Sequence, residues 1–400
     1  MSFETPFIIA VPDTKVAALQ RKLAETTFPD ELDDAGWDYG VPLKDMKRLV
    51  SRWRDGYDWR AAEKELNDAL PQFTRDIDIG GFGVLNIHYV HQRSNAVDAI
   101  PLLFVHGWPG SFIEVKKILP LLTKSSPEHP SFNVVAFSLP GFGFSEAPRK
   151  KGFGLEQYAE VGHKLMQALG YTEYVTQGGD WGHFITRAIA SLYGPKYVKA
   201  WHTNMAVAQP PVFTSHPWQY ILHMLTPYTD EERVGLARGK RFRELGFGYF
   251  LQQSTQPQTL GYSLADSPAG LLAWIYEKLV NSSDKYEWTD DEVLTWISIY
   301  WFSRAGPTAS TRIYYENRLI FSQFSAYKPT IPLGLALFPA ESRPPQTWIA
   351  TMGSLVFQQK HPRGGHFASY EQPEALVEDV RRMFGKGGPA FAVVPGKTGY

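Results

Sequence analysis

The feature that most constrains the fold of this chain is the pentapeptide GGDWG at residues 178–182. A strand-like segment, YTEYVTQ, comes before it, and a helix-like segment, HFITRAIASLYG, follows it. Small residues two places before and two places after a nucleophile allow the tight strand-to-helix turn usually written G-x-S-x-G. Aspartate occupies the place of the serine here. The pattern therefore predicts that Asp180 stands at the turn between a buried strand and a helix.

An aspartate at this turn indicates alkyl transfer rather than acyl transfer. A serine that becomes alkylated is an inert ether, whereas an alkylated carboxylate is an ester that water can cleave at the aspartate carbonyl. An aspartate side chain is ionised at neutral pH, so it attacks without help from a base. A general base is therefore needed only for the second step, in which water hydrolyses the ester on Asp180.

The candidate base is His366, in the segment GGHF at residues 364–367. This segment follows the last strand-like segment and precedes an amphipathic pattern over residues 373–384 that predicts the final helix. Chains built around this turn carry the nucleophile, the orienting acid and the histidine in that order. His366 is therefore the predicted base.

The orienting acid should follow the preceding strand, IPLGLALFP, at residues 331–339. Glu341 comes directly after that strand and is the predicted acid. Three other acids lie between the nucleophile and the histidine, but they fall in a helical region, where we expect them to cap or solvate helices: Asp290, Asp291 and Glu316.

A second turn, HGWPG at residues 106–110, closes the strand-like segment IPLLFV. A loop in this position contributes one backbone N–H to an oxyanion hole, and the residue after the nucleophile contributes the other. The predicted donors are therefore the backbone N–H groups of Trp108 and Trp181, because Pro109 has none. We expect His106 to order this loop through hydrogen bonds.

The remaining pattern predicts an α/β protein. The segment VLNIHYVHQ alternates like a half-buried strand, and IPLLFV and FNVVAFS are continuous apolar runs typical of buried parallel strands. A helical pattern over residues 155–169 follows them. We therefore predict a mostly parallel central sheet with an inserted helical lid and an N-terminal wrapping segment. The predicted divisions are 1–95 (wrapping segment), 96–212 (core, first part), 213–320 (helical lid) and 321–400 (core, second part, and tail).

Composition excludes several functions. The 40 Lys and Arg residues nearly balance the 41 Asp and Glu residues, so no overall field attracts nucleic acid or anionic lipid. Cysteine is absent, which excludes disulfides, thiolate catalysis and cysteine-based metal sites. No window holds eighteen consecutive apolar residues, and no targeting signal is evident. We expect a cytoplasmic protein that acts on a small, weakly charged ligand.

These motifs together resemble the epoxide hydrolases of the α/β-hydrolase fold, in particular the microsomal-type branch with its N-terminal segment. The usual membrane-anchor helix of that branch does not precede them, so the chain resembles the soluble fungal members, and we expect no stable membrane insertion. The matching segments extend over nearly the whole chain: FPDE (28–31), WDYGVPL (37–43), YDWR (57–60), LPQFT (70–74), IHYVHQRS (87–94), STQPQTLGYSLADSPAGLLAWIYEK (254–278), FPAESR (338–343) and GGHFASYEQPE (364–374).

The resemblance implies that a small apolar epoxide and water become a vicinal diol, without cofactor or metal. Opening the ring requires proton donors that stay protonated at neutral pH, which tyrosines supply. Spacing does not choose among the nine tyrosines of the lid region: Tyr220, Tyr228, Tyr249, Tyr262, Tyr276, Tyr286, Tyr300, Tyr314 and Tyr315. The resemblance implies Tyr249, in GYFLQQST, and Tyr314, in RIYYEN. The family and the aromatic lid are also compatible with a homodimer.

Two alternatives stay open at this point. A haloalkane dehalogenase also uses an aspartate followed by tryptophan at this turn, but a departing halide needs no proton donor. The matching lid tyrosines and the N-terminal segment favour the epoxide. A second alternative is a catalytically silent protein of the same fold that binds a ligand without turnover. An intact nucleophile, acid and base argue against it.

Overall fold

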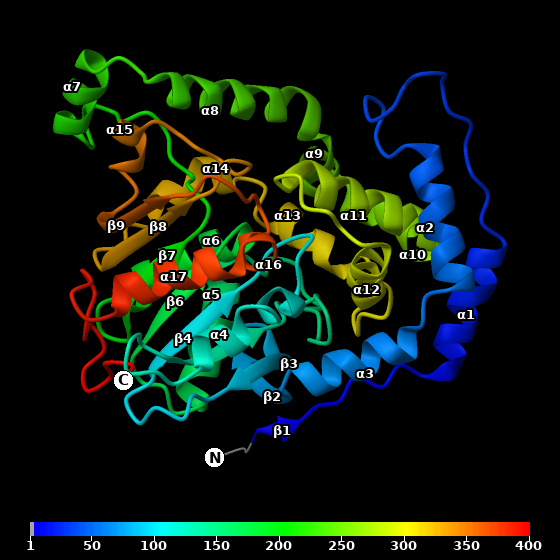
Figure 1. Ribbon diagram of the computed structural model, residues 1–400, viewed down its shortest axis with the longest axis horizontal. Helices are drawn as coiled ribbons and strands as arrows, with labels where there is room; N and C mark the ends of the chain where they lie inside the picture. Colours follow the sequence, from blue (N-terminus) through cyan, green and yellow to red (C-terminus); the bar gives the residue numbers. More distant parts are fainter. Residues whose placement is uncertain (1–3) are drawn as a thin grey trace.

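The computed structural model describes residues 4–400 (Figure 1). Residues 1–3 of the predicted N-terminal segment lie outside the described residues. The described chain is built around a nine-stranded sheet with the strand order β1-β2-β3-β5-β4-β6-β7-β8-β9. The strands are β1 (Thr5–Pro6), β2 (Gln72–Ile79), β3 (Gly83–Gln92), β4 (Ile100–Val105), β5 (Phe132–Phe137), β6 (Tyr174–Gly178), β7 (Val198–Thr203), β8 (Pro332–Leu337) and β9 (Ser354–Lys360).

The sheet has an antiparallel edge and a parallel body. Strands β1, β2 and β3 pair antiparallel, and so do β3 and β5. From β5 through β4, β6, β7 and β8 to β9, every neighbouring pair is parallel. The predicted α/β class with a mostly parallel sheet is confirmed. Because the body is parallel, the strands β4, β6, β8 and β9 all end on the same side of the sheet. Ligand sites of such sheets form at these carboxyl ends.

Helices cover both faces of the parallel body. Figure 1 shows α4 (Leu119–Thr123) and α17 (Pro373–Phe384) in front of the sheet, with α5 (Leu155–Ala168) and α6 (Trp181–Tyr193) behind it. All six residues of β4 are buried, which explains why this strand reads as a continuous apolar run. Two short helices, η1 (Phe112–Val115) and α16 (Ala368–Glu371), pack together near the carboxyl ends of the parallel strands.

A long helical insertion separates β7 from β8. We call the helices between these two strands the insertion. It contains α7 (Pro217–Leu225), α8 (Asp230–Arg241), the π-helical turn η2 (Phe242–Gly246), α9 (Gly248–Thr255), α10 (Pro257–Asp266), α11 (Pro268–Ser282), α12 (Asp290–Trp301), η3 (Ala309–Thr311), α13 (Arg312–Glu316), α14 (Ile320–Gln323) and η4 (Phe324–Ala326). In Figure 1, α7 and α8 extend across the top of the molecule, while α9 to α12 lie beside the sheet.

The N-terminal helices α1 (Asp13–Ala24), α2 (Leu43–Asp55) and α3 (Trp59–Ala69) pack against the insertion (Figure 1). The guanidinium of Arg52 in α2 forms a two-pronged ion pair with Asp291 of α12, with both N–O distances at 2.8 Å. The Trp59 ring lies 4.9 Å from the ring of Phe302, centroid to centroid. Aromatic and charged contacts therefore attach the N-terminal segment to the insertion.

The sequence patterns do not predict β2, β7 or β9, nor the short helix α15 (Gln346–Ile349). Strand β9, SLVFQQK, lies at the edge of the sheet with no buried residue, so it lacks the apolar run of a buried strand. No helix within residues 4–400 is both long enough and apolar enough to cross a membrane.

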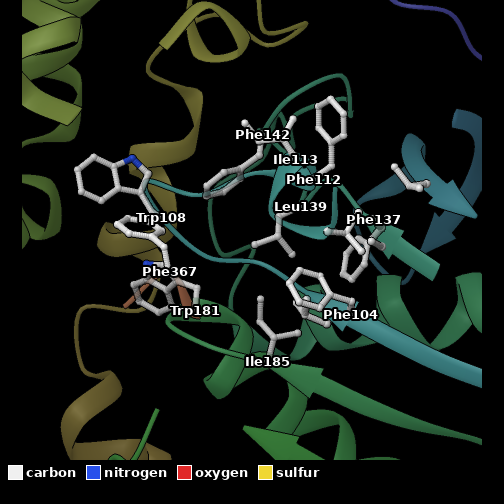
Figure 2. Packing of buried hydrophobic residues seen from close by; sticks show 14 of the residues in the cluster. Phe104, Trp108, Phe112, Ile113, Phe137, Leu139, Phe142, Trp181, Ile185 and Phe367 are labelled. Carbon is white, nitrogen blue, oxygen red and sulfur yellow. The ribbon is translucent and has the colours of Figure 1, made fainter. Parts of the chain in front are cut away.

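The core next to the carboxyl ends of the parallel strands is rich in aromatic side chains. Figure 2 shows Phe104 of β4, Phe137 of β5 and Ile185 of α6 in the buried cluster beside the loop that carries Trp108. Each of these three apolar side chains is at most 3% exposed. Close packing in this cluster fixes the loop beside it, because a well-packed core leaves few alternative positions.

Candidate active site

Asp180 occupies the turn between β6 and α6. Its backbone φ is +51° and its ψ is −130°, a conformation that is rare outside glycine. Such a conformation costs on the order of 1–3 kcal/mol and persists only where the surroundings enforce it. The strand ends at Gly178 and the helix begins at Trp181, as the pentapeptide predicts. The turn presents the carboxylate at the carboxyl end of a central strand.

The glycines of the pentapeptide permit this turn for a steric reason. A Cβ atom on Gly178 would lie 2.7 Å from the carbonyl oxygen of Gly182. A Cβ atom on Gly182 would overlap the carbonyl oxygen of Val105 in β4. Both glycines therefore allow the first turn of α6 to approach the neighbouring strands more closely than any other residue could.

His366 lies between two carboxylates. Its Nδ1 is 2.6 Å from Oε2 of Glu341, which follows β8, and its Nε2 is 3.5 Å from Oδ2 of Asp180. The backbone N–H of His366 donates to the carbonyl of Ser282, 2.9 Å away, which fixes the loop after β9. Burial alone would lower the pKa of His366, but the Glu341 and Asp180 carboxylates outweigh burial and raise that pKa well above its usual range.

The loop after β4 reaches over Asp180. The backbone N–H of Trp108 donates to Oδ1 of Asp180 at 2.7 Å. Trp181 is the first residue of α6, so its backbone N–H has no acceptor within the helix. A Cβ atom on Gly107 would overlap the Asp180 side chain, so this close approach depends on glycine. The two predicted oxyanion donors thus come from different segments, the loop after β4 and the first residue of α6.

His106 supports that loop from below. Its Nδ1 lies 2.9 Å from the carbonyl oxygen of Gly107, and its Nε2 accepts from the backbone N–H of Leu139 at 3.2 Å. Burial lowers the pKa of His106 to about 4, so the ring is neutral at neutral pH. A neutral ring with one donating and one accepting nitrogen suits both contacts. His106 therefore orders the loop, as the sequence predicts.

Tyr249 of α9 and Tyr314 of α13 lie above Asp180. Their ring centroids are 5.9 Å apart, and Trp108 stacks on Tyr249 at 5.3 Å. The Tyr314 ring meets the Trp181 ring edge to face at 5.0 Å. The Tyr314 hydroxyl is buried and has no hydrogen-bond partner of normal geometry among the described residues. Burial, aided by the Asp180 charge, raises the pKa of both hydroxyls, so both stay protonated at neutral pH.

Four other tyrosines of the insertion are engaged elsewhere or exposed. The Tyr300 hydroxyl donates to the carbonyl of Gly110 at 2.6 Å, and the Tyr286 hydroxyl donates to Glu292 at 2.7 Å. Tyr262 and Tyr315 are 70% and 41% exposed. The structure thus makes a distinction that spacing does not.

The three other candidate acids have roles elsewhere in the fold. Asp290 and Asp291 stand in the first turn of α12, where they pair with Arg48 and Arg52 of α2. Glu316 ends α13. Of the four candidate orienting acids, Glu341 is the one that contacts His366.

A cavity of about 570 Å³ opens from Asp180 into the insertion. The carboxylate of Asp180, His366, Glu341 and both tyrosines line it. Its walls are largely apolar and come mostly from the insertion: Phe184, Leu236, Phe242, Phe247, Phe250, Phe321 and Trp348. Such a cavity suits an apolar molecule that presents one polar atom to the tyrosines.

Sequence reasoning missed Glu114 in η1. Its carboxyl lines a second, small cavity of about 10 Å³, which Asp180 and His366 also line. Burial raises the pKa of Glu114 to about 8, although the nearby His366 charge opposes this. The available signal was a single acid within the apolar run Phe112-Ile113-Glu114-Val115. Acids are seldom enclosed by a folded chain, so an acid that is held among apolar residues needs a reason.

The fold and the site together define a class of protein. A mostly parallel sheet with a nucleophile at a strand-to-helix turn, followed by an acid and a histidine, is the arrangement of the α/β-hydrolases. The family described as "alpha/beta hydrolase fold" matches residues 100–234. The structure of Aspergillus niger epoxide hydrolase is similar, with a TM-score of 0.82 and 32% identity over 95% of each chain.

Further similarities identify the family. The family described as "Epoxide hydrolase N terminus" matches residues 4–115. Epoxide hydrolase 1 of Sus scrofa is 36% identical over 95% of this chain and 88% of its own length. The juvenile hormone epoxide hydrolase of Bombyx mori matches with a TM-score of 0.85 and 29% identity over 95% of this chain and 93% of its own. This chain belongs to the epoxide hydrolases, and the resemblance predicted from its motifs is confirmed.

Proposed function

We propose that the protein converts an epoxide and water to a vicinal diol through a covalent hydroxyalkyl ester on Asp180. One observation carries this proposal: a carboxylate, a histidine paired with a second carboxylate, and two protonated tyrosines, Tyr314 buried and Tyr249 half-buried, line one apolar cavity. A carboxylate that opens a ring at an sp³ carbon needs proton donors on the opposite side of that carbon, and the two tyrosines are the groups that supply them.

In the proposed first step, Oδ2 of Asp180 attacks an epoxide carbon while Oδ1 stays bound to the backbone N–H of Trp108. The bond between that carbon and the ring oxygen breaks. Tyr249 and Tyr314 hold the ring oxygen, and one of them gives it a proton. Alkylation removes the negative charge of Asp180, which lowers the pKa of His366, so the imidazolium can return a proton to the tyrosine.

In the proposed second step, neutral His366 takes a proton from water as the water oxygen bonds to the Asp180 carbonyl carbon. The N–H groups of Trp108 and Trp181 stabilise the oxyanion, and loss of one such donor typically costs about 2.7–4 kcal/mol of barrier. The bond to the alkyl oxygen then breaks, and that oxygen receives the proton from His366. The carboxylic acid left on Asp180 returns its proton to His366, which restores the starting state.

The test is mass spectrometry of a His366→Gln variant after incubation with aryl and alkyl epoxides, and separately with haloalkanes. Without its base, the variant should accumulate an adduct of epoxide mass on the peptide that contains Asp180. An alkyl adduct that forms only from haloalkanes would instead support a dehalogenase. If no panel member gives an adduct and the wild-type protein turns none over, the proposed chemistry is wrong.

We also propose a homodimer and a cytoplasmic location. Exposed apolar side chains on α7 support self-association: Trp218 and Leu225 are 65% and 76% exposed. Light scattering after size exclusion tests the dimer, and cell fractionation tests the location. A monomer over the micromolar range, or recovery in another compartment, would contradict the respective proposal.

A further inference from the structure

We propose that Glu114 holds the water molecule that cleaves the Asp180 ester, so that it acts as a positioning residue in the second step. The inference rests on the proposed function, because it concerns the hydrolysis of that ester. It goes beyond that function by assigning a place and a partner to the water.

The small cavity beside Asp180 has the size and lining of a water site. Its volume of about 10 Å³ approaches what one water molecule requires. Asp180 and His366 line it together with Glu114 and Ser369. A water molecule here would therefore lie beside the two groups that must react with it.

A water molecule that attacks the ester needs two hydrogen-bond acceptors. One hydrogen goes to Nε2 of His366, and the other needs an acceptor of its own. Oδ1 of Asn204, another cavity residue, already accepts from the side-chain amide of Gln177 at 2.8 Å. The Glu114 carboxyl has two oxygens: it accepts from the backbone N–H of Ser111, and its Oε2 lies 3.5 Å from Oγ of Ser369, which is a long contact that leaves room for a further hydrogen bond. The Glu114 carboxyl is therefore the side chain best placed to accept the second hydrogen.

The protonation of Glu114 suits this task. The groups that act on it electrostatically are Asp180 and His366, and the Tyr300 hydroxyl also lies near it. Because burial raises the pKa of Glu114 to about 8, the side chain is mostly a neutral carboxylic acid at pH 7. A neutral acid adds no negative charge beside Asp180, accepts at its carbonyl oxygen and can donate its own proton to Ser369.

In this step Glu114 neither gains nor loses a proton. The water oxygen bonds to Cγ of Asp180, one water hydrogen moves to Nε2 of His366, and the other stays on the oxygen, bonded to Glu114. The bond to the alkyl oxygen then breaks, and that oxygen takes the proton from His366. An amide could replace the carboxylic acid in this role, whereas an apolar side chain could not.

The test compares Glu114→Gln, which keeps an acceptor oxygen, with Glu114→Met, which has a similar length but no oxygen. Glu63→Gln is the matched control, because Glu63 is a buried acid in α3 that is hydrogen-bonded to Val11 and Arg60. Rapid-quench mass spectrometry with an aryl epoxide follows formation and loss of the Asp180 ester separately, and thermal melting checks each fold.

In Glu114→Met we expect ester formation within about threefold of wild type and ester hydrolysis slowed about tenfold or more, so that ester accumulates. Glu114→Gln should restore most of the hydrolysis rate, and Glu63→Gln should change neither rate constant. Equal slowing of both steps in Glu114→Met, or hydrolysis as slow in Glu114→Gln as in Glu114→Met, would overturn the inference. Unchanged hydrolysis in Glu114→Met would overturn it too. By contrast, a complete lack of ester in wild type and in His366→Gln would overturn the proposed function itself.

Discussion

Nδ1 of His366 lies 2.6 Å from Oε2 of Glu341, so a carboxylate on a neighbouring loop fixes the orientation of the ring. The contact selects the tautomer with the proton on Nδ1, which leaves Nε2 free to act on water. Glutamate has one carbon more than aspartate, and the structure uses that length to reach from the end of β8 to the loop after β9.

Removing the charge of Glu341 should slow the second step more than the first. We expect Glu341→Gln to reduce ester hydrolysis roughly 100-fold or more, because the imidazolium loses its partner and the amide can impose the wrong tautomer. Rapid-quench measurement of the two steps checks this. In Glu341→Asp the carboxylate retreats by one carbon, so we expect a smaller loss. A Glu341→Gln variant with wild-type ester hydrolysis would show that another group orients the ring.

The two tyrosines should act in ring opening. We expect Tyr249→Phe and Tyr314→Phe each to slow ester formation roughly 10- to 100-fold, and the double variant to lose nearly all of it, because no proton donor then faces the alkoxide. Tyr262→Phe is the matched control, since that side chain belongs to the insertion but is exposed. Loss confined to ester hydrolysis would contradict the assigned role.

The protonation of His366 should depend on the charge of Asp180. The two carboxylates outweigh burial and hold the pKa of His366 above its ordinary value of 6.5. We therefore expect the resting imidazole to be charged at pH 7, and Asp180→Asn to lower its pKa. NMR titration of the ring in both proteins measures this. A resting pKa below 6.5, or no change in the variant, would exclude the proposed proton return to the tyrosine.

His202 should make the fold sensitive to acid. This residue of β7 is fully buried, neither ring nitrogen has a partner among the described residues, and burial lowers its pKa to about 3. The unfolded chain binds a proton near pH 6.5 and the folded chain does not. Burial of neutral His202 therefore costs no stability through protonation above pH 6.5, and the free energy of unfolding decreases as the pH falls from 6.5 towards 3.

We compare the free energy of unfolding of His202→Leu with that of wild type. The variant's value relative to wild type should be roughly 2 kcal/mol higher at pH 5 than at pH 8. Denaturant unfolding at both pH values measures this. Parallel pH dependence of the two proteins would show that His202 does not titrate on unfolding in this range.

Gly182 should tolerate no side chain. Because a Cβ atom there would overlap the carbonyl oxygen of Val105, we expect Gly182→Ala to destabilise the fold by about 3 kcal/mol or more, or to prevent folding. Gly239→Ala in α8 is the control, since its Cβ would meet only the end of the Arg243 side chain, 3.8 Å away. The control should be neutral or slightly stabilising. Equal stability of the two variants would contradict the steric argument.

The parts of this protein that sequence predicts best are those where a local rule operates. The turn at Asp180 requires small residues at fixed places, and a doubly buried strand such as β4 must be apolar throughout. Strand β9 follows neither rule, because it lies at the edge of the sheet, where half-exposed polar residues such as Gln358 and Gln359 are tolerated. Its place in the sheet comes from pairing with β8, which is a tertiary contact.

The site shows the same division. Order along the chain predicts Glu341 and His366, because each must follow a strand that ends at the same edge. Spacing does not select Tyr249 and Tyr314, since their meeting depends on how α9 packs on α13. The single acid in the run Phe112–Val115 does not by itself predict a role for Glu114, because only the fold brings this carboxyl to the cavity that Asp180 and His366 also line.

The insertion leaves the sheet after β7 and returns at β8, and these two strands are neighbours in which Trp201 pairs with Leu333. Its two ends are therefore held side by side, whatever length of chain runs between them. Recombination between related genes at these two points would exchange both tyrosines and most of the cavity wall together, while Asp180 and His366 stayed with the sheet. Such an exchange offers a route by which descendants of this chain could take up new substrates without rebuilding the machinery that hydrolyses the ester.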